Sequence, residues 1–167
     1  MRSSRCTLFR SWTSPRLRLG AQLGAVREVV ATTARENEVP LGVVEQMNLR
    51  ISQLNGCAFC VHVHHRRALR AGVPAEQLAQ LPVWRETPRF NAVERAALLV
   101  GETITLLPEP SIRDRDLLAA LAVLSEGAFA AIEWSAILIN TYNRLSIASH
   151  HPVPGAKRPL SHQQEQP

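Results

Sequence analysis

Two cysteines separated by two residues and followed by three histidines form the part of this sequence best suited to chemistry. Residues 55–65 read NGCAFCVHVHH and contain two of the three cysteines in a chain of 167 residues. Such a pair is compatible with a structural disulfide, a covalent haem attachment, a metal site or a redox-active dithiol. Haem attachment requires histidine directly after the second cysteine, and Val61 occupies that position, so the sequence excludes it.

The number of further cysteines and ligands separates the remaining alternatives. Three cysteines cannot form the disulfide framework of a small extracellular domain, so the pattern favours a reducing compartment, and we expect a cytoplasmic protein. A structural zinc site needs four ligands, and the chain has no second C-x-x-C. Cys57, Cys60 and His64 could supply three ligands, with a carboxylate or water as the fourth. This alternative stays open, although we expect neither a metal nor a cofactor.

A redox-active dithiol explains the cysteine spacing directly. Residues three apart lie on consecutive turns of a helix, which can bring Cys57 and Cys60 together. At a helix start a thiol also lies near unpaired backbone N–H groups and the positive end of the helix dipole, which favour the thiolate. Because the thiolate is the nucleophile, we expect Cys60 to be ionised near neutral pH. His64 follows four residues later on the same face, and Glu45 reaches this site if its helix and the next form an antiparallel hairpin.

The elements that must position these residues are predicted to be helices. Apolar residues recur every three or four positions along residues 21–36 and 41–54, and no convincing alternation typical of strands occurs. The first stripe contains Leu23, Val26, Val30 and Thr33. Asn55 and Gly56 are expected to end the second helix, because both tolerate left-handed backbone angles.

A central helix with the C-x-x-C at its N-terminus is then expected over about residues 57–71. Asn91 and Glu94 resemble a capping box. Ser111 and Asp114 have the same spacing, with Asp in place of Glu, so each pair predicts a helix start. Further helices are therefore predicted over about residues 75–81, 91–107 and 111–124, and a last long helix over about residues 125–149. The fold class is therefore predicted to be all-α, a single compact domain of about six or seven helices.

The net charge of +5 belongs to the N-terminal part of the chain. Residues 1–27 contain six arginines and no acidic residue, and the rest is nearly balanced. We therefore expect no nucleic-acid partner. No stretch approaches the roughly 18 uninterrupted apolar residues of a transmembrane helix, so we expect no membrane association. We expect a disordered basic extension over residues 1–18, a helical domain over residues 19–150 and a disordered polar tail over residues 151–167.

The cysteine segment resembles a known family. Glu45, eleven further residues and then the cysteines and His64, within the run NLRISQLNGCAFCVHVHHRRALRAGV, are similar to the alkyl hydroperoxidase D-like core. These proteins belong to the carboxymuconolactone decarboxylase-like superfamily. The segments WRETPRFNAVERAALLVGETIT and LINTYNRLSIAS also resemble helices of the family, so the resemblance covers about residues 18–150.

The resemblance implies an all-helical homo-oligomer, commonly a trimer or hexamer, with thiol-dependent peroxidase or disulfide-reductase activity. It implies that Cys60 attacks a small hydroperoxide and that Cys57 resolves the resulting sulfenic acid. His64 and Glu45 would form the proton relay, and an external dithiol on a lipoyl or thioredoxin-like protein would restore the thiols. Phe59 stands where the best-studied branch has a histidine, so the relay is one member shorter here. The decarboxylase members generally lack the dithiol, which argues against lactone chemistry.

Three rivals to the peroxidase remain. One is a redox sensor that is oxidised stoichiometrically, one is the metal-binding protein, and one is a non-redox lactone decarboxylase-like enzyme in which His64 and Glu45 do acid–base work on a carbon acid. Other polar and aromatic residues receive no catalytic role. Trp84 and Trp134 are expected to be core or interface anchors, and capping or bridging between subunits is expected for Asn140, Asn143 and Arg144.

Overall fold

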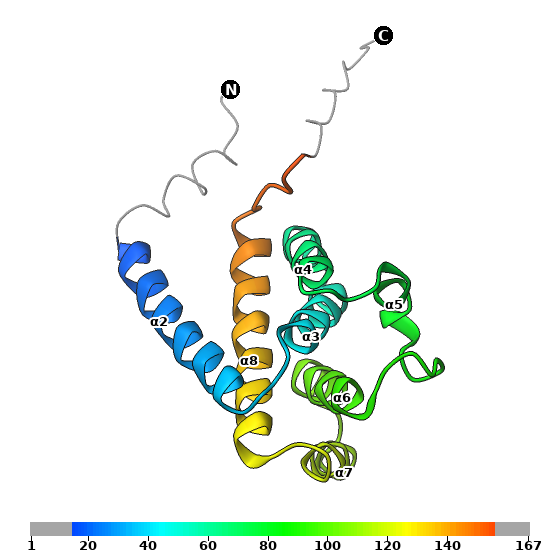
Figure 1. Cartoon of the computed structure of the whole chain (residues 1–167). Coiled ribbons are helices and arrows are strands. Elements are labelled where there is room, and N and C mark those ends of the chain that lie inside the picture. Colours follow the sequence, from blue (N-terminus) through cyan, green and yellow to red (C-terminus); the bar gives the residue numbers. More distant parts are fainter. Residues whose placement is uncertain (1–14, 156–167) are drawn as a thin grey trace.

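Every regular element in the described part of the chain is a helix, as the spacing of apolar side chains predicted. The computed structural model describes residues 15–155 and contains seven α-helices and one 3₁₀-helix there, without a strand (Figure 1). In chain order these are α2 (Pro15–Glu36), α3 (Leu41–Leu54), α4 (Ala58–Arg70), α5 (Ala75–Ala79), η1 (Leu81–Val83), α6 (Ala92–Leu106), α7 (Pro110–Leu121) and α8 (Glu126–Ala148). The predicted all-α class and single domain are confirmed, whereas assembly into an oligomer stays a prediction.

Helix α3 is the centre of the fold because it is buried on several sides. Met47 and Ile51 pack with α6 and α8 in one core cluster, which includes Val100 and Ile132. Leu49 belongs to a second cluster that includes Trp84 and extends over α4, α5 and η1. A helix that contributes to two clusters must present apolar side chains on opposite faces. The polar residues that α3 also buries therefore lie between packed helices.

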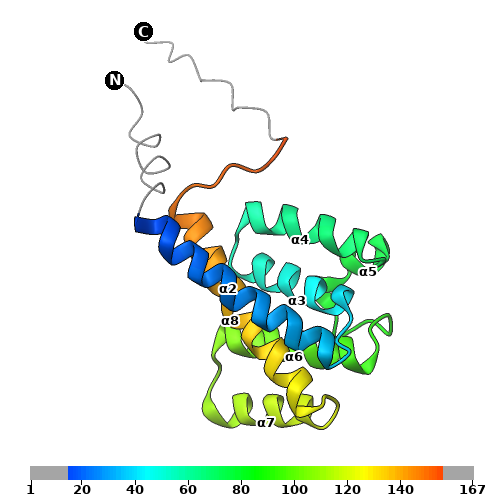
Figure 2. The ribbon, with the colours of Figure 1, turned by 60° about the vertical axis from the view of Figure 1, so that its left-hand side comes forward.

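The helices form a stack that is crossed by two further helices. Helices α4, α3, α6 and α7 lie one beside the other, and α8 runs across them in contact with α3 and α6 (Figures 1 and 2). Helix α2 packs on α8, and Val30 and Ala34 are buried on α2. The expected stripe on α2 is partly wrong, since Val26 is exposed, and the helix begins at Pro15 rather than near residue 21.

Three local signals at helix ends had different outcomes. The capping box at Asn91 is confirmed, because the Glu94 N–H donates to the Asn91 side chain and the Asn91 N–H donates to the Glu94 carboxylate. The predicted cap at Ser111 is wrong: α7 begins at Pro110, whose lack of an N–H suits the first turn. After α3 only Gly56 is left-handed, with φ of 68°, while Asn55 is right-handed.

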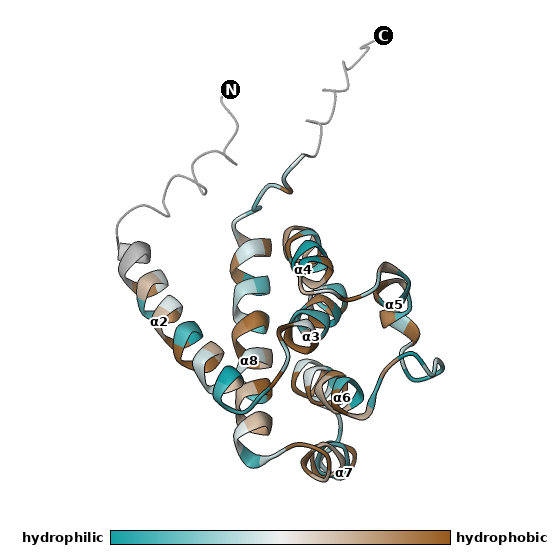
Figure 3. Ribbon diagram, in the orientation of Figure 1, coloured by the Kyte–Doolittle hydropathy of each residue, from teal (hydrophilic) through white to brown (hydrophobic). Residues whose placement is uncertain are grey.

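Apolar residues, brown in Figure 3, occur on helices throughout the fold, and some of them are buried whereas others are exposed. Trp84 is buried, which confirms it as a core anchor, whereas Trp134 on α8 is half exposed. None of the described helices combines the length and the apolar character that crossing a bilayer requires. The predicted extension up to residue 14, with Cys6, and the predicted tail from residue 156 onward lie outside the described residues.

Candidate active site

The dithiol lies at the start of α4, where the turn at Gly56 folds the chain back along α3. Cys57 is the N-cap of α4, and its sulfur accepts a hydrogen bond from the Cys60 N–H at 3.4 Å. Both cysteines are free thiols. The face of α4 that carries Cys57, Cys60 and His64 is buried, and so is Ala68 one turn further along. The C-x-x-C therefore occupies the helix start that its spacing predicted.

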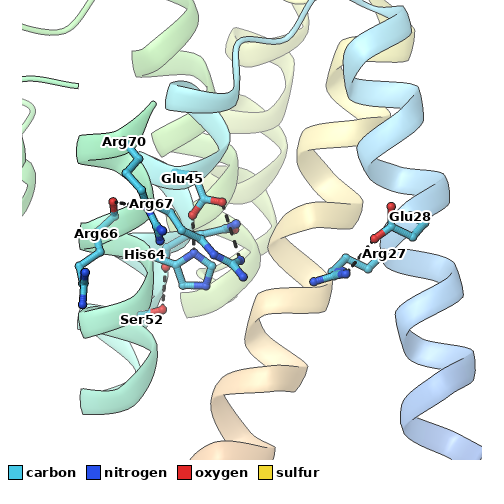
Figure 4. Close-up of polar contacts among 9 residues, drawn as sticks. Arg27, Glu28, Glu45, Ser52, His64, Arg66, Arg67 and Arg70 are labelled. Carbon is cyan, nitrogen blue, oxygen red and sulfur yellow. Dashed lines mark hydrogen bonds and ion pairs between the residues drawn. The ribbon is translucent and has the colours of Figure 1, made fainter. Parts of the chain in front are cut away.

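Glu45 and His64 form a buried pair beside the dithiol. Nδ1 of His64 lies 2.6 Å from a carboxylate oxygen of Glu45, and both side chains are more than nine-tenths buried. The other carboxylate oxygen lies 3.9 Å from Arg67, so Glu45 sits between an imidazole and a guanidinium group (Figure 4). The α3–α4 hairpin thus brings together two residues that are 19 positions apart in the sequence.

This pair fixes the orientation of the imidazole. A carboxylate on one ring nitrogen of a histidine holds the ring in place and favours the proton on that nitrogen. In His64 the carboxylate engages Nδ1, which leaves Nε2 as the nitrogen available to accept a proton. His64 can therefore act as a general base toward a group in the adjoining pocket.

The ionisation of Cys60 differs from the expectation. Burial raises the pKa of the Cys60 thiol to about 11, the neighbouring Cys57 raises it further, and Asn143 and Ser146 act in the opposite direction. The predicted thiolate near neutral pH is therefore wrong for this arrangement of the reduced protein. Desolvation outweighs the favourable position at the helix N-terminus. A base must remove the proton before the sulfur can react as a nucleophile.

A buried asparagine on α8 is a site residue that the sequence did not indicate. The Asn143 side chain is buried, donates to the Ser52 hydroxyl at 3.1 Å and accepts from the Asn55 amide at 2.9 Å. The Asn55 amide also donates to Asn140. These asparagines tie the α3–α4 turn to α8 within the chain, and their expected role between subunits stays a prediction. Polar residues at positions 140, 143 and 146 repeat at helical spacing along an apolar helix, a signal that could have indicated them.

Arg144, placed in the same expected group, has its contacts on its own helix. Its guanidinium donates at 3.0 Å to the backbone and side-chain oxygens of Asn140, one turn earlier on α8. This pairing lies within the chain, and the expected role of Arg144 between subunits stays a prediction.

A pocket of about 670 Å³, the large pocket, opens beside Cys60 between α2, α3, α4 and α8. Glu45, His64 and Arg67 line it together with Cys60, and most of the remaining wall is apolar. Asn48 also lines it, and the buried side-chain oxygen of this residue has no hydrogen-bond partner within residues 15–155. Buried acceptors are normally paired, so this oxygen is an exception among the buried polar atoms around the pocket.

A smaller pocket of about 180 Å³, the small pocket, lies on the side of Cys57. It is lined by Ala58 and by residues from the last turn of α8 and the segment after it, including Ile147 and His151. His151, which the sequence placed in the tail, packs against Phe59 with ring centroids 4.3 Å apart at an angle of 61°. Such an edge-to-face arrangement is favourable for aromatic rings.

The metal-binding alternative requires three clustered ligands. Within the part of the chain that the structure describes, no three His, Cys, Asp or Glu side chains are grouped so that they could hold a metal ion. The three-ligand set that the sequence left open therefore has no counterpart there.

The family follows from the sequence segment that builds this site. The carboxymuconolactone decarboxylase family matches residues 19–103, about half of the chain, which includes both α3 and α4. The chain belongs to this family. This carboxymuconolactone decarboxylase family protein is 33% identical over 104 residues to the uncharacterized protein YdfG of Bacillus subtilis (strain 168), across 62% of this chain and 71% of that protein.

The fold also occurs in a solved structure. The crystal structure of ATU0492 from Agrobacterium tumefaciens superposes with a TM-score of 0.71, covering 86% of this chain and 98% of that chain at 23% identity. It is described as a protein of unknown function and a candidate antioxidant defence protein AhpD. At this identity the likeness shows the fold. Together with the family match it confirms the resemblance to the alkyl hydroperoxidase D-like and carboxymuconolactone decarboxylase-like superfamily.

Proposed function

We propose that this protein is a thiol-dependent peroxidase that reduces organic hydroperoxides with the Cys57–Cys60 dithiol. The observation that carries the proposal is the buried His64–Glu45 pair, which shares a largely apolar pocket with the Cys60 thiol. In this proposal Cys60 is the nucleophile, His64 the general base and Glu45 the group that orients the base, and their position around one cavity supports these roles. A hydroperoxide with an organic substituent fits the apolar wall of the large pocket.

The first step consumes the hydroperoxide. Nε2 of His64 accepts the Cys60 proton, and the sulfur attacks the terminal oxygen of the hydroperoxide. The O–O bond breaks, and the leaving alkoxide receives a proton from His64 and departs as an alcohol. Cys60 becomes a sulfenic acid, which is the first oxidised state of a cysteine. The sulfur is oxidised by two electrons, and the peroxide is reduced by two.

The second step converts the sulfenic acid into a disulfide. The Cys57 sulfur attacks the Cys60 sulfur, the S–S bond forms, and the hydroxyl group leaves with the Cys57 proton as water. The hydrogen bond of 3.4 Å from the Cys60 N–H to the Cys57 sulfur supports the closeness of the two residues that this step requires. An external dithiol, on a lipoyl or thioredoxin-like protein, then reduces the disulfide by exchange and becomes a disulfide itself.

The direct test measures thiols and peroxide together. Reduced protein mixed with cumene hydroperoxide should lose two titratable thiols for each hydroperoxide consumed, which a thiol titration and a peroxide assay check. Protein whose Cys57 and Cys60 have been alkylated should consume none. Equal consumption by the alkylated and unmodified proteins would contradict the peroxidase. Retention of another activity after alkylation would favour the non-redox enzyme in which His64 and Glu45 act alone.

Glu45→Gln tests whether the carboxylate positions His64. We expect the rate of hydroperoxide consumption at neutral pH to fall by about 100-fold, because an amide cannot stabilise the protonated imidazole as a carboxylate does. Stopped-flow measurement of thiol loss gives the rate, and Glu45→Asp should recover part of it. Glu36→Gln, at the exposed end of α2, is the matched control and should react like the wild type. A Glu45→Gln rate within twofold of wild type would remove Glu45 from the relay.

A further inference from the structure

We propose that the two substrates reach the two cysteines through different pockets. The hydroperoxide reaches Cys60 through the large pocket, and the reducing dithiol reaches Cys57 through the small pocket. The inference rests on the proposed peroxidase function and identifies the site at which its second substrate, a small or arm-borne dithiol, reacts. It divides the catalytic cycle between two openings of the same protein.

The first support is the position of each cysteine relative to the pockets. Cys60 lines the large pocket and not the small one, while Cys57 lines the small pocket and not the large one. Both residues are buried, with 5% and 2% of their surface exposed. Because so little of either residue is exposed, a reactant must approach each sulfur through its pocket. The two sulfurs of one disulfide are therefore accessible from different directions.

The second support is the wall between the pockets. Phe59, Ser146 and His151 line both pockets and therefore separate them. Phe59 lies between the two cysteines in the chain, and its ring contacts that of His151. The His151 N–H donates to the Ser146 carbonyl at 3.0 Å, which holds the segment after α8 against the last turn of that helix. The wall is thus made by α4, α8 and the segment that follows α8.

The third support is the chemistry of disulfide reduction. A thiolate of the dithiol attacks the Cys57 sulfur, the Cys57–Cys60 bond breaks, and Cys60 leaves as a thiolate that takes a proton from His64. The second thiolate of the reductant then attacks the reductant sulfur bound to Cys57, closes a disulfide on the reductant and releases Cys57 as a thiolate. Of the two protons that the dithiol gives up, one reaches Cys60 through His64 and the other protonates Cys57. Attack at Cys57 makes Cys60 the leaving group, and Cys60 is the cysteine that shares its pocket with His64.

The size of the small pocket restricts which reductants can reach Cys57. At about 180 Å³ it is below the range of roughly 300–1,000 Å³ typical of pockets that enclose whole small molecules. It suits the thiol-bearing end of a flexible arm or a compact dithiol, with the rest of the reductant outside. The large pocket, at about 670 Å³, lies within that range and accommodates an organic hydroperoxide.

Leu145 and Ile147, which are two positions apart on α8, provide a matched pair of variants. Leu145 lines only the large pocket and is 39% exposed, whereas Ile147 lines only the small pocket and is 45% exposed. Tryptophan at either position narrows one pocket without replacing a core residue. Ala58→Trp, at the exposed start of α4, narrows the small pocket from its other side and serves as a second variant.

The experiment measures the two half-reactions separately. Reduced protein is mixed with cumene hydroperoxide, and protein oxidised with diamide is mixed with dihydrolipoamide; alkylation and mass spectrometry then count thiols at each time. We expect Ile147→Trp and Ala58→Trp to slow reduction of the disulfide at least about tenfold and to leave oxidation within about twofold of wild type. Leu145→Trp should slow oxidation and leave reduction unchanged.

Three results would decide against the inference. It is wrong if Ile147→Trp and Ala58→Trp reduce normally, if Leu145→Trp slows both half-reactions equally, or if a monothiol forms its mixed disulfide on Cys60 rather than Cys57. A wild-type protein that does not consume cumene hydroperoxide would overturn the proposed peroxidase instead. The diamide-oxidised protein would still show which pocket admits the dithiol.

Discussion

Cys60→Ser is expected to abolish hydroperoxide consumption, with a fall in rate of at least about 10³-fold. A serine hydroxyl is a far weaker nucleophile than a thiolate, and it cannot form a sulfenic acid. The measurement is the loss of cumene hydroperoxide in the presence of excess dihydrolipoamide, followed until the wild-type protein has turned over many times. Equal consumption by Cys60→Ser and wild type would show that the mechanism is wrong.

Cys57→Ser is the matched control, because it replaces the other member of the dithiol. This variant retains Cys60 and the His64–Glu45 pair, so in the absence of dihydrolipoamide it should consume about one equivalent of hydroperoxide and then stop without a disulfide. Dimedone should label Cys60 in that state, and mass spectrometry should locate the label. The absence of a dimedone label on Cys60 after exposure to peroxide would contradict the assignment of Cys60 as the attacking thiol.

His64→Gln is expected to slow the reaction by about 10²–10⁴-fold at pH 7, because it removes the base that takes the Cys60 proton. Its pH dependence is the more specific readout. Burial raises the pKa of the Cys60 thiol to about 11, so the thiol stays protonated throughout the neutral range. Without the base, the rate should follow the thiolate fraction and rise about tenfold for each pH unit between 7 and 10. The wild type should rise less steeply over that range.

His65→Gln is the control for this variant. His65 is the next residue on α4 but is exposed, and it does not line the large pocket. Its rate and pH profile should match those of the wild type. If His64→Gln and wild type show the same slope with pH, the proton does not pass through His64, whatever the absolute rates.

The parts of the site that the sequence predicted are those governed by local spacing. Cys57, Cys60 and His64 are three and four residues apart, and a single helix places them on one face regardless of what packs around it. Glu45 required one further assumption, an antiparallel hairpin across the turn at Gly56. The structure meets that assumption and brings Glu45 within hydrogen-bonding distance of His64.

The parts that could not be predicted depend on packing between distant segments. The predicted ionisation of Cys60 was wrong because burial decides the pKa of this thiol, and the spacing of residues along one helix gives no measure of burial. Asn143 belongs to the site only because α8 crosses the α3–α4 turn, 88 positions from Asn55 in the chain. His151 contacts Phe59 for the same kind of reason. No rule of local sequence relates these residues.

The sulfur of Cys57 is both the N-cap of α4 and one of the two atoms that change their bonding in the proposed cycle. Sulfur is a weak acceptor, and at 3.4 Å it supports the first turn of the helix less strongly than a serine or aspartate oxygen would. A strong cap at this position would oppose the movement of the Cys57 side chain that each turnover requires. The weak N-cap at Cys57 leaves this sulfur free to change its bonding partner while the rest of α4 stays helical.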